Sequence, residues 1–217
     1  MSSKQKTVII GAGGHSKVII DILRTDPMIE IAGCLDRSGK GEIMNVPVLG
    51  DDSMLPLLHD QGIRHAFVAI GDNNTRGRIA RHVEQIGFTL INAISPHAYV
   101  APSARLGSGI AVMPGAVINA EAHIHDLAVI NTGATIDHET MIGRYCHVAP
   151  GSNLSGNVHV MEGTFLGTGT KVIDGILIGA WSILGAGSVA IRDLPARCLA
   201  VGVPARVIKQ LREPFDS

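Results

Sequence analysis

The sequence predicts a small α/β nucleotide-binding domain, with βαβαβ order like half of a Rossmann fold, followed by a left-handed parallel β-helix. Three observations predict it: an aliphatic, glycine-rich composition, a glycine turn after the first apolar strand, and a six-residue repeat through the second half. Of the 217 residues, 46% are hydrophobic, 17% charged and 3% aromatic, and 26 are glycine. Such values are typical of a β-rich, turn-dense protein. The composition changes near residue 95, so we expect domains at 1–95 and 96–192 and a tail at 193–217.

Charge and cysteine content exclude several classes of function. With 18 basic and 19 acidic residues the net charge is near zero, so no basic surface is predicted for nucleic acid or an anionic membrane. No apolar stretch reaches the roughly 18 residues of a membrane span, and we expect a cytoplasmic protein without membrane insertion. Cys34, Cys146 and Cys198 are widely spaced, which predicts reduced, mostly buried thiols rather than disulfides or a zinc site.

The first strand and its turn predict an anion site. Thr7–Ile10 has the pattern of a buried parallel strand, and Gly11-Ala12-Gly13-Gly14-His15 follows as a tight turn into a helix that we expect to end near Arg24. Such a turn presents backbone N–H groups and a helix N-terminus to phosphate. A second predicted strand, Glu30–Leu35, ends in Asp36, where a carboxylate can reach ribose hydroxyls.

The rest of the first half predicts a domain that is too short for a full dinucleotide-binding fold. A third strand at His65–Ile70 runs into Gly71, a helix is expected from about Thr75 to Ile86, and a last strand at Thr89–Ile94. The first glycines and Asp36 match part of a dinucleotide fingerprint, but Ser16 replaces its third glycine and about 95 residues suffice for only half of that fold. A mononucleotide site fits better; the alternative is a glycine turn that serves the fold alone.

A period of six begins at Val100. Fifteen consecutive sixth residues are aliphatic, and the residue four positions after each is usually small. The aliphatic positions are Val100, Leu106, Val112, Ile118, Ile124, Ile130, Ile136, Ile142, Val148, Leu154, Val160, Leu166, Val172, Ile178 and Leu184. This period fits a solenoid with three flat sides per coil, with aliphatic residues inside and small ones at the corners. Fifteen hexads make about five coils, and coils spaced like paired strands form a prism roughly 24 Å tall.

Ionisable residues interrupt this pattern. Asp137, His138 and Glu139 are consecutive, and His147 follows half a coil later, which argues against a purely structural solenoid. After the last coil, Arg206, Lys209 and Arg212 are expected on a short helix, either as an ordinary solvated face or as contacts to ligand phosphates.

Several motifs together resemble one family, the sugar-modifying hexapeptide-repeat acetyltransferases related to bacillosamine and perosamine N-acetyltransferases and sialic acid O-acetyltransferases. The likeness covers nearly the whole chain. The motifs are Ile9-Ile10-Gly11-Ala12-Gly13-Gly14-His15, Val68-Ala69-Ile70-Gly71-Asp72-Asn73, Val129-Ile130-Asn131-Thr132, Asp137-His138-Glu139 and Gly202-Val203-Pro204-Ala205-Arg206.

The resemblance implies an acetyl-CoA-dependent N-acetyltransferase that acts on a nucleotide-linked 4-amino-4,6-dideoxy sugar for glycan or surface-polysaccharide synthesis. It implies His138 as the general base and Glu139 as its acidic neighbour, and a homotrimer with active sites between subunits. The implied substrate residues are Gly13, Gly14, His15, Asp36, Arg37, Gly71 and Asn131. The implied acetyl-CoA residues are His147, Gly156, Thr168 and Ala186, the last in place of a frequent glycine.

Histidine suits the base role because it exchanges a proton near neutral pH, and a carboxylate beside it fixes its tautomer. The amine attacks directly in a ternary complex, so no acyl-enzyme on Cys146 is needed, and a backbone amide such as that of Gly156 stabilises the oxyanion.

Three alternatives remain open at this stage. One is O-acetylation of a sugar of the sialic acid type, and another is a trimer that binds nucleotide sugars without catalysis. The third is a metal enzyme like the γ-class carbonic anhydrases, suggested by His123 and His125. That class needs two histidines five residues apart, and this spacing does not occur among His123, His125, His138, His147 and His159. No metal is therefore expected.

Overall fold

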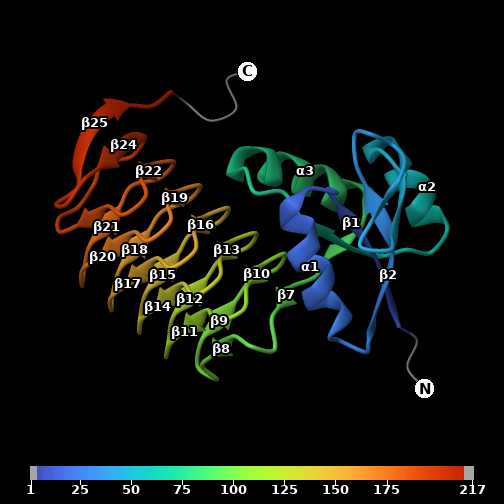
Figure 1. Cartoon of the computed structure of the whole chain (residues 1–217), viewed down its shortest axis with the longest axis horizontal. Helices are drawn as coiled ribbons and strands as arrows, with labels where there is room; N and C mark the ends of the chain where they lie inside the picture. The colour runs from blue at the N-terminus through green and yellow to red at the C-terminus, as the bar shows by residue number, and fades with distance from the viewer. Residues whose placement is uncertain (1–3, 213–217) are drawn as a thin grey trace. The chain divides into compact units, whose positions relative to one another are not determined.

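A computed structural model describes residues 4–212 (Figure 1). The chain divides between Ile94 and Ser95 into two compact units. Unit 1 is the N-terminal one and unit 2 the C-terminal one. Within the described range, no helix has the length and apolar character needed to cross a bilayer.

Unit 1 is a mostly parallel sheet with strand order β3-β4-β2-β1-β5-β6. Its strands are β1 (Gln5–Ile10), β2 (Ile29–Leu35), β3 (Glu42–Ile43), β4 (Val46–Gly50), β5 (His65–Val68) and β6 (Thr89–Leu90), and β7 (Ala93–Ile94) ends the unit. The helices are α1 (Gly14–Arg24), the 3-10 turn η1 (Asp52–Met54), α2 (Leu55–Asp60) and α3 (Asn73–Ile86). Val8, Ile9 and Ile10 of β1 are at most 1% exposed, as the uninterrupted apolar run predicts for a central parallel strand.

Local signals set the ends of α3. The Asp72 side chain accepts a hydrogen bond from Thr75 N at 2.8 Å, which caps the first turn, and Gly87 ends the helix in the left-handed conformation (φ 109°). The predicted strands and helices of unit 1 agree with the structure within a few residues. Two differences are the segment 42–60, where β3, β4, η1 and α2 were not predicted, and the last strand, which is broken between β6 and β7.

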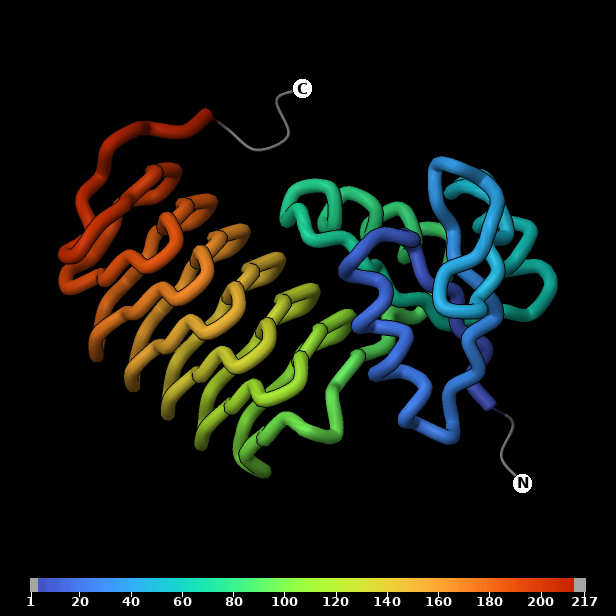
Figure 2. Tube along the Cα trace, viewed as in Figure 1, coloured from blue at the N-terminus to red at the C-terminus, as the bar shows by residue number. Residues whose placement is uncertain are grey.

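Unit 2 is a left-handed parallel β-helix whose coils lie one above another (Figure 2). Paired strands are 18 residues apart, as Ala111 opposite Val129 shows, so each coil consists of three hexads as predicted.

We call the three sides of the prism sheet C, sheet D and sheet E. Sheet C contains β10 (Ala111–Val112), β13 (Val129–Ile130), β16 (His147–Val148), β19 (Phe165–Leu166) and β22 (Ile183–Leu184). Sheet D contains β8 (Tyr99–Val100), β11 (Val117–Ile118), β14 (Thr135–Ile136), β17 (Asn153–Leu154), β20 (Lys171–Val172) and β23 (Val189–Ala190). Sheet E contains β9 (Arg105–Leu106), β12 (His123–Ile124), β15 (Met141–Ile142), β18 (His159–Val160) and β21 (Leu177–Ile178).

The core of the prism is the column of repeat aliphatics. From Val112 to Leu184 every one of them is at most 2% exposed. The small corner residues are buried too, and their hydroxyls bond to the next coil: Thr140 Oγ1 donates to Ser155 O at 2.9 Å and Ser152 Oγ to Gly167 O at 3.0 Å. Small polar residues are therefore tolerated inside the prism because each hydrogen bond is satisfied.

The tail differs from its prediction. Instead of a helix, Arg206 and Lys209 lie on strand β25 (Arg206–Gln210), which pairs antiparallel with β24 (Cys198–Val201). β24 in turn extends sheet C beside β22. The outer edge of β24 offers unpaired backbone groups, and the β-branched Val207 and Ile208 favour a strand that satisfies them. The predicted helix was wrong for this reason.

Candidate active site

Unit 1 contains a cavity of about 520 Å³ at the C-terminal ends of β1, β2 and β5. Gly11 opens the turn with φ +110°, and a Cβ there would lie 2.9 Å from Ala69 O, so only glycine fits. Gly13 and Gly14 leave open space where a Cβ would stand. All six residues predicted for the substrate in unit 1 line this one cavity: Gly13, Gly14, His15, Asp36, Arg37 and Gly71.

Asp36 is held as a carboxylate. Its Oδ1 accepts from Ser38 N at 2.9 Å, and hydrogen bonds from the backbone and side chain of Ser38 are the main reasons that its pKa is lowered. A carboxylate at the end of β2 is an acceptor for ribose hydroxyls.

His15 is a neutral group in the cavity wall. Burial, and then the charge of Arg76, lower its pKa to about 4. A neutral imidazole retains both a donor and an acceptor nitrogen, so His15 is suited to hydrogen bonding rather than to charge pairing.

Arg76, which is 1% exposed, was not among the predicted site residues. Its guanidinium donates to Ile70 O at 2.9 Å, to Gly71 O at 3.0 Å and to Asn73 Oδ1 at 2.8 Å. It thereby holds the loop that forms one wall of the cavity. No motif distinguished it from the other arginines of α3, because its burial depends on the packed sheet.

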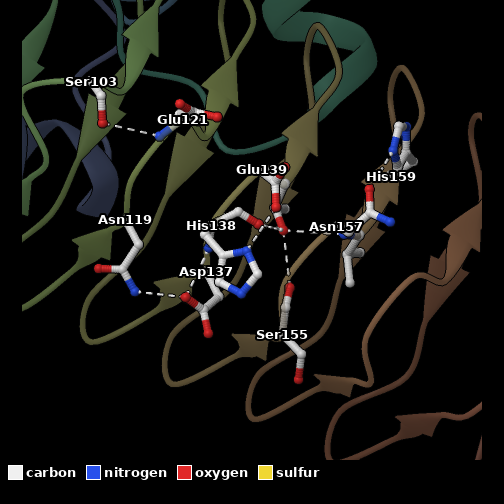
Figure 3. Close-up of polar contacts among 11 residues, drawn as sticks. Ser103, Asn119, Glu121, Asp137, His138, Glu139, Ser155, Asn157 and His159 are labelled. Atoms are coloured by element: carbon white, nitrogen blue, oxygen red, sulfur yellow. Dashed lines mark hydrogen bonds and ion pairs between the residues drawn. The ribbon is translucent and has the colours of Figure 1, made fainter.

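In unit 2, His138 and Glu139 lie where the chain turns from sheet D to sheet E, which we call the His138 edge (Figure 3). His138 Nδ1 lies 3.1 Å from Glu139 Oε2, and the two side chains are 56% and 61% exposed. Glu139 occupies a left-handed corner position (φ 57°), one of a series that recurs every six residues. This backbone turn brings the carboxylate back towards the preceding imidazole.

Asp137 has a different role from Glu139. Its Oδ1 accepts from His138 N at 2.8 Å and from Asn119 Nδ2 at 2.9 Å, and these hydrogen bonds lower its pKa. The carboxylate therefore joins the turn to the previous coil, while Glu139 alone pairs with the imidazole (Figure 3).

Gly156, one coil further along the same edge, accommodates the imidazole. A Cβ at Gly156 would lie 2.4 Å from His138 Cε1 and 2.6 Å from Nε2, so the ring occupies the space of the missing side chain. Within the described chain, neither the Gly156 N–H nor His138 Nε2 has a hydrogen-bond partner. A free donor and a free imidazole nitrogen are thus adjacent.

The other predicted residues of unit 2 lie elsewhere. Asn131, Thr168 and Ala186 lie where sheet C turns into sheet D, which we call the Asn131 edge. Asn131 Nδ2 contacts His147 Nε2 at 3.0 Å, although one was predicted for the sugar and the other for acetyl-CoA. His147 is 8% exposed and packs edge-on against Phe165, with ring centroids 5.2 Å apart. The width of sheet D therefore separates these residues from His138.

Known proteins share this architecture along nearly the whole chain. The chain is 50% identical to PerB of Caulobacter crescentus, solved with CoA and GDP-perosamine, over 94% of this chain and 97% of that one, with a TM-score of 0.91. It is 33% identical to the acetyltransferase domain of PglB from Neisseria gonorrhoeae, solved with acetyl coenzyme A, over 95% and 100% of the chains, again with a TM-score of 0.91.

The chain belongs to the sugar-modifying hexapeptide-repeat acetyltransferases. This membership confirms the expected acetyl-CoA-dependent acyltransferase and its fold. Consistently, the family described as the PglD N-terminal domain matches residues 6–83. An uncharacterized protein of Acanthamoeba polyphaga mimivirus is 32% identical over 123 residues, which are 56% of this chain and 24% of that protein. The chain thus spans about a quarter of this curated relative's length.

Two further predictions for this acetyltransferase concern its histidines and cysteines. His123 and His125 stack with centroids 4.1 Å apart, and residues 4–212 contain no group of three or more histidine, cysteine, aspartate or glutamate side chains placed to hold a metal ion. The three cysteines are free and buried, as predicted. Cys146 Sγ donates to Met161 O at 3.0 Å inside the prism, away from any exposed edge.

Proposed function

We propose that this chain transfers the acetyl group of acetyl-CoA to the amino group of a nucleotide-linked 4-amino-4,6-dideoxy sugar. The likeness to the Caulobacter enzyme, which was solved with CoA and GDP-perosamine, supports this substrate class. The unit 1 cavity supports it as well, because the open space at Gly13 and Gly14 leaves room for a diphosphate. We place the enzyme in the cytoplasm, in glycan or surface-polysaccharide synthesis.

The observation that carries the proposal is the arrangement of His138, Glu139 and Gly156. With Nδ1–H donating to Glu139, the lone pair of His138 Nε2 is free to accept a proton. Histidine-to-asparagine and histidine-to-alanine variants of the Caulobacter enzyme, each at a single position, were solved with the same two ligands.

The proposed reaction needs one base and one oxyanion donor. His138 Nε2 takes a proton from the sugar amine as its nitrogen forms a bond to the acetyl carbonyl carbon. The Gly156 N–H donates to the oxygen that becomes negative. The carbon–sulfur bond then breaks, and the proton held on His138 passes to the departing CoA thiolate. The products are the N-acetylated sugar nucleotide and CoA.

We further propose a homotrimer with its sites between subunits. Residues predicted for acetyl-CoA occur at both edges of the prism, Gly156 on the His138 edge and Thr168 and Ala186 on the Asn131 edge. One prism cannot bring both edges together, because sheet D lies between them. A neighbour that presents its Asn131 edge to the His138 edge completes the site, and repetition of this heterologous contact closes a ring.

Release of CoA from acetyl-CoA, followed with a thiol reagent, tests the reaction. We expect rapid release with a GDP-linked 4-amino-4,6-dideoxy sugar and almost none with the sugar nucleotide that has a hydroxyl in place of the amine. Equal rates with both would indicate an O-acetyltransferase. If neither this pair of substrates nor the corresponding UDP- and dTDP-linked pairs release CoA, the proposed substrate class is wrong.

A further inference from the structure

Three neighbouring strands of unit 1 end at the cavity in a fixed spatial order. β1 ends at the glycine turn, β2 at Asp36 and β4 just before η1, and the strands lie in the order β4-β2-β1. All three are parallel, so their C-terminal ends share one edge of the sheet. A nucleotide with its diphosphate at the turn and its ribose at Asp36 therefore extends its base towards η1.

Two consecutive aspartates stand at that position and differ in their contacts. Asp51 Oδ1 accepts from Ser53 N at 3.0 Å and from Ser53 Oγ at 2.6 Å, so it is occupied in capping η1. The Asp52 carboxylate accepts no hydrogen bond from residues 4–212. Asp52 lines the cavity and is only partly exposed, so its acceptor oxygens are available to a ligand.

Each of the two cavities that Asp52 lines is also lined by arginine. Arg37 lines the cavity at the glycine turn. Asp52 and Ile79 also line a neighbouring cavity of about 510 Å³, whose other lining residues are Arg78, Arg81, His82 and Gln85 of α3. The region beyond the ribose thus combines one free carboxylate with guanidinium groups.

This combination is complementary to guanine. Guanine presents two adjacent donors, N1–H and the N2 amino group, which the two oxygens of one carboxylate can accept together. Its O6 and N7 are acceptors to which arginine donates in a bidentate manner. Uracil and thymine present one N–H between two carbonyl oxygens, which a carboxylate repels, and adenine places a ring acceptor beside its amino group.

We propose that this cavity selects a guanine nucleotide, with Asp52 accepting hydrogen bonds from N1–H and the N2 amino group and Arg37 or Arg78 donating to O6 or N7. The inference deepens the proposed function, on which it rests for the presence of a nucleotide, by naming the base that the sequence alone left open.

Calorimetric titration of the intact protein with GDP, IDP and UDP, without acetyl-CoA, tests the proposal. IDP differs from GDP only by the missing N2 amino group. A hydrogen bond to a charged group is worth about 1.5–3 kcal/mol, so we expect GDP to bind roughly 10- to 100-fold more tightly than IDP, and UDP to bind more weakly than GDP. In Asp52→Asn the ratio of GDP to IDP affinity should fall towards one. Asp60→Asn, the same change at the end of α2, should alter neither affinity.

The wild-type measurements alone can overturn the proposal. They would do so if the protein bound GDP and IDP, or GDP and UDP, with equal affinity. An unchanged affinity ratio in Asp52→Asn would overturn the role of that residue. The acetyl-transfer assay separates this inference from the proposed function. Selective GDP binding without acetyl transfer to any amino sugar would refute the function and leave the base selection standing. Equal acetyl transfer to UDP- and GDP-linked sugars would refute only the base selection.

Discussion

At the scale of single residues, neighbouring side chains of the same chemistry have different tasks because the backbone aims them differently. Asp137 and Glu139 flank His138, yet Asp137 bonds to the backbone and to Asn119 while Glu139 bonds to the imidazole. Asp51 and Asp52 show the same division in unit 1. Which carboxylate serves chemistry is therefore a question of hydrogen-bond geometry.

Removal of the proposed base is the first test at this scale. His138→Ala should leave the prism folded, because the ring lies at an exposed edge and not among the buried aliphatics. Loss of a general base should lower kcat by about 10²- to 10⁴-fold while affinity for both substrates changes little. His159→Ala, which removes a partly exposed histidine of sheet E, is the matched control and should remain active. A His138→Ala protein that binds both ligands and keeps more than about a tenth of kcat would rule out this mechanism.

The Glu139 carboxylate can be tested without disturbing the corner. Glu139→Gln retains the side-chain shape and adds no new demand on the left-handed backbone, whereas it removes the charge that stabilises a protonated His138. We expect a smaller loss of kcat than for His138→Ala and an altered pH profile of kcat/KM. An unchanged kcat and pH profile would show that Glu139 only shapes the turn.

His15 should make the stability of unit 1 depend on pH. Its pKa is about 4 in the folded protein, below the usual 6.5, so the folded state favours the neutral imidazole. This contribution is complete above pH 6.5. As the pH falls from 6.5 towards 4, His15 becomes protonated in the unfolded chain but stays neutral in the folded one. The free energy of unfolding therefore decreases by up to about 3 kcal/mol.

Urea unfolding at pH 7.5 and pH 5 measures this effect through the helical circular dichroism signal. Within residues 4–212 the helices belong to unit 1, so the signal reports on that unit. His15→Gln should lose less stability between the two pH values than the wild-type protein. Equal losses would show that other groups cause the acid sensitivity.

At the scale of elements, the glycine turn contains one glycine that its backbone conformation requires, Gly11, and one that we expect to be required for nucleotide binding, Gly13. Gly11 has φ +110° and no room for a Cβ, so Gly11→Ala should destabilise unit 1. Gly13 has φ −91° and open space around it, so Gly13→Val should fold normally while its side chain obstructs the phosphates. We expect thermal unfolding to shift only for Gly11→Ala and nucleotide affinity to fall for Gly13→Val. Undiminished nucleotide binding by Gly13→Val would place the nucleotide elsewhere.

The β-helix corners illustrate how elements constrain residues. Every sixth residue from Gly109 to Gly187 has positive φ, and the position is not always glycine. The hexad rule therefore accounts for the conformation of Glu139, although the rule was recognised from the aliphatic and small residues at other positions of the repeat. The tail shows the opposite case, because β25 takes its strand conformation from pairing with β24.

At the scale of the whole molecule, the two edges of the prism predict a shared active site. A protein with His138→Ala is defective at one edge, and a protein with bulky Thr168→Trp is defective at the other. If each site combines the His138 edge of one chain with the Asn131 edge of its neighbour, mixed trimers contain some sites with both edges intact. Unfolding and refolding an equal mixture should restore about one quarter of wild-type activity, since each edge is intact with a chance of one half.

Sedimentation velocity supplies the companion measurement. We expect a trimer for the wild-type protein and for both variants. A fully active monomer, or a refolded mixture no more active than its components, would contradict the shared site.

The features that could be predicted from the sequence are those that repeat or that are local in the chain. The hexad period predicts the prism, its buried aliphatics and its 18-residue coil, because every coil meets an equivalent neighbour. The glycine turn predicts the cavity residues Gly13, Gly14 and His15, because β1, its turn and α1 are consecutive in the chain. Three features became visible only in the folded chain: the burial of Arg76, the Asn131–His147 pair and the strand conformation of the tail. Each of these depends on residues that meet only when distant segments of the chain pack together, and no local pattern records such contacts.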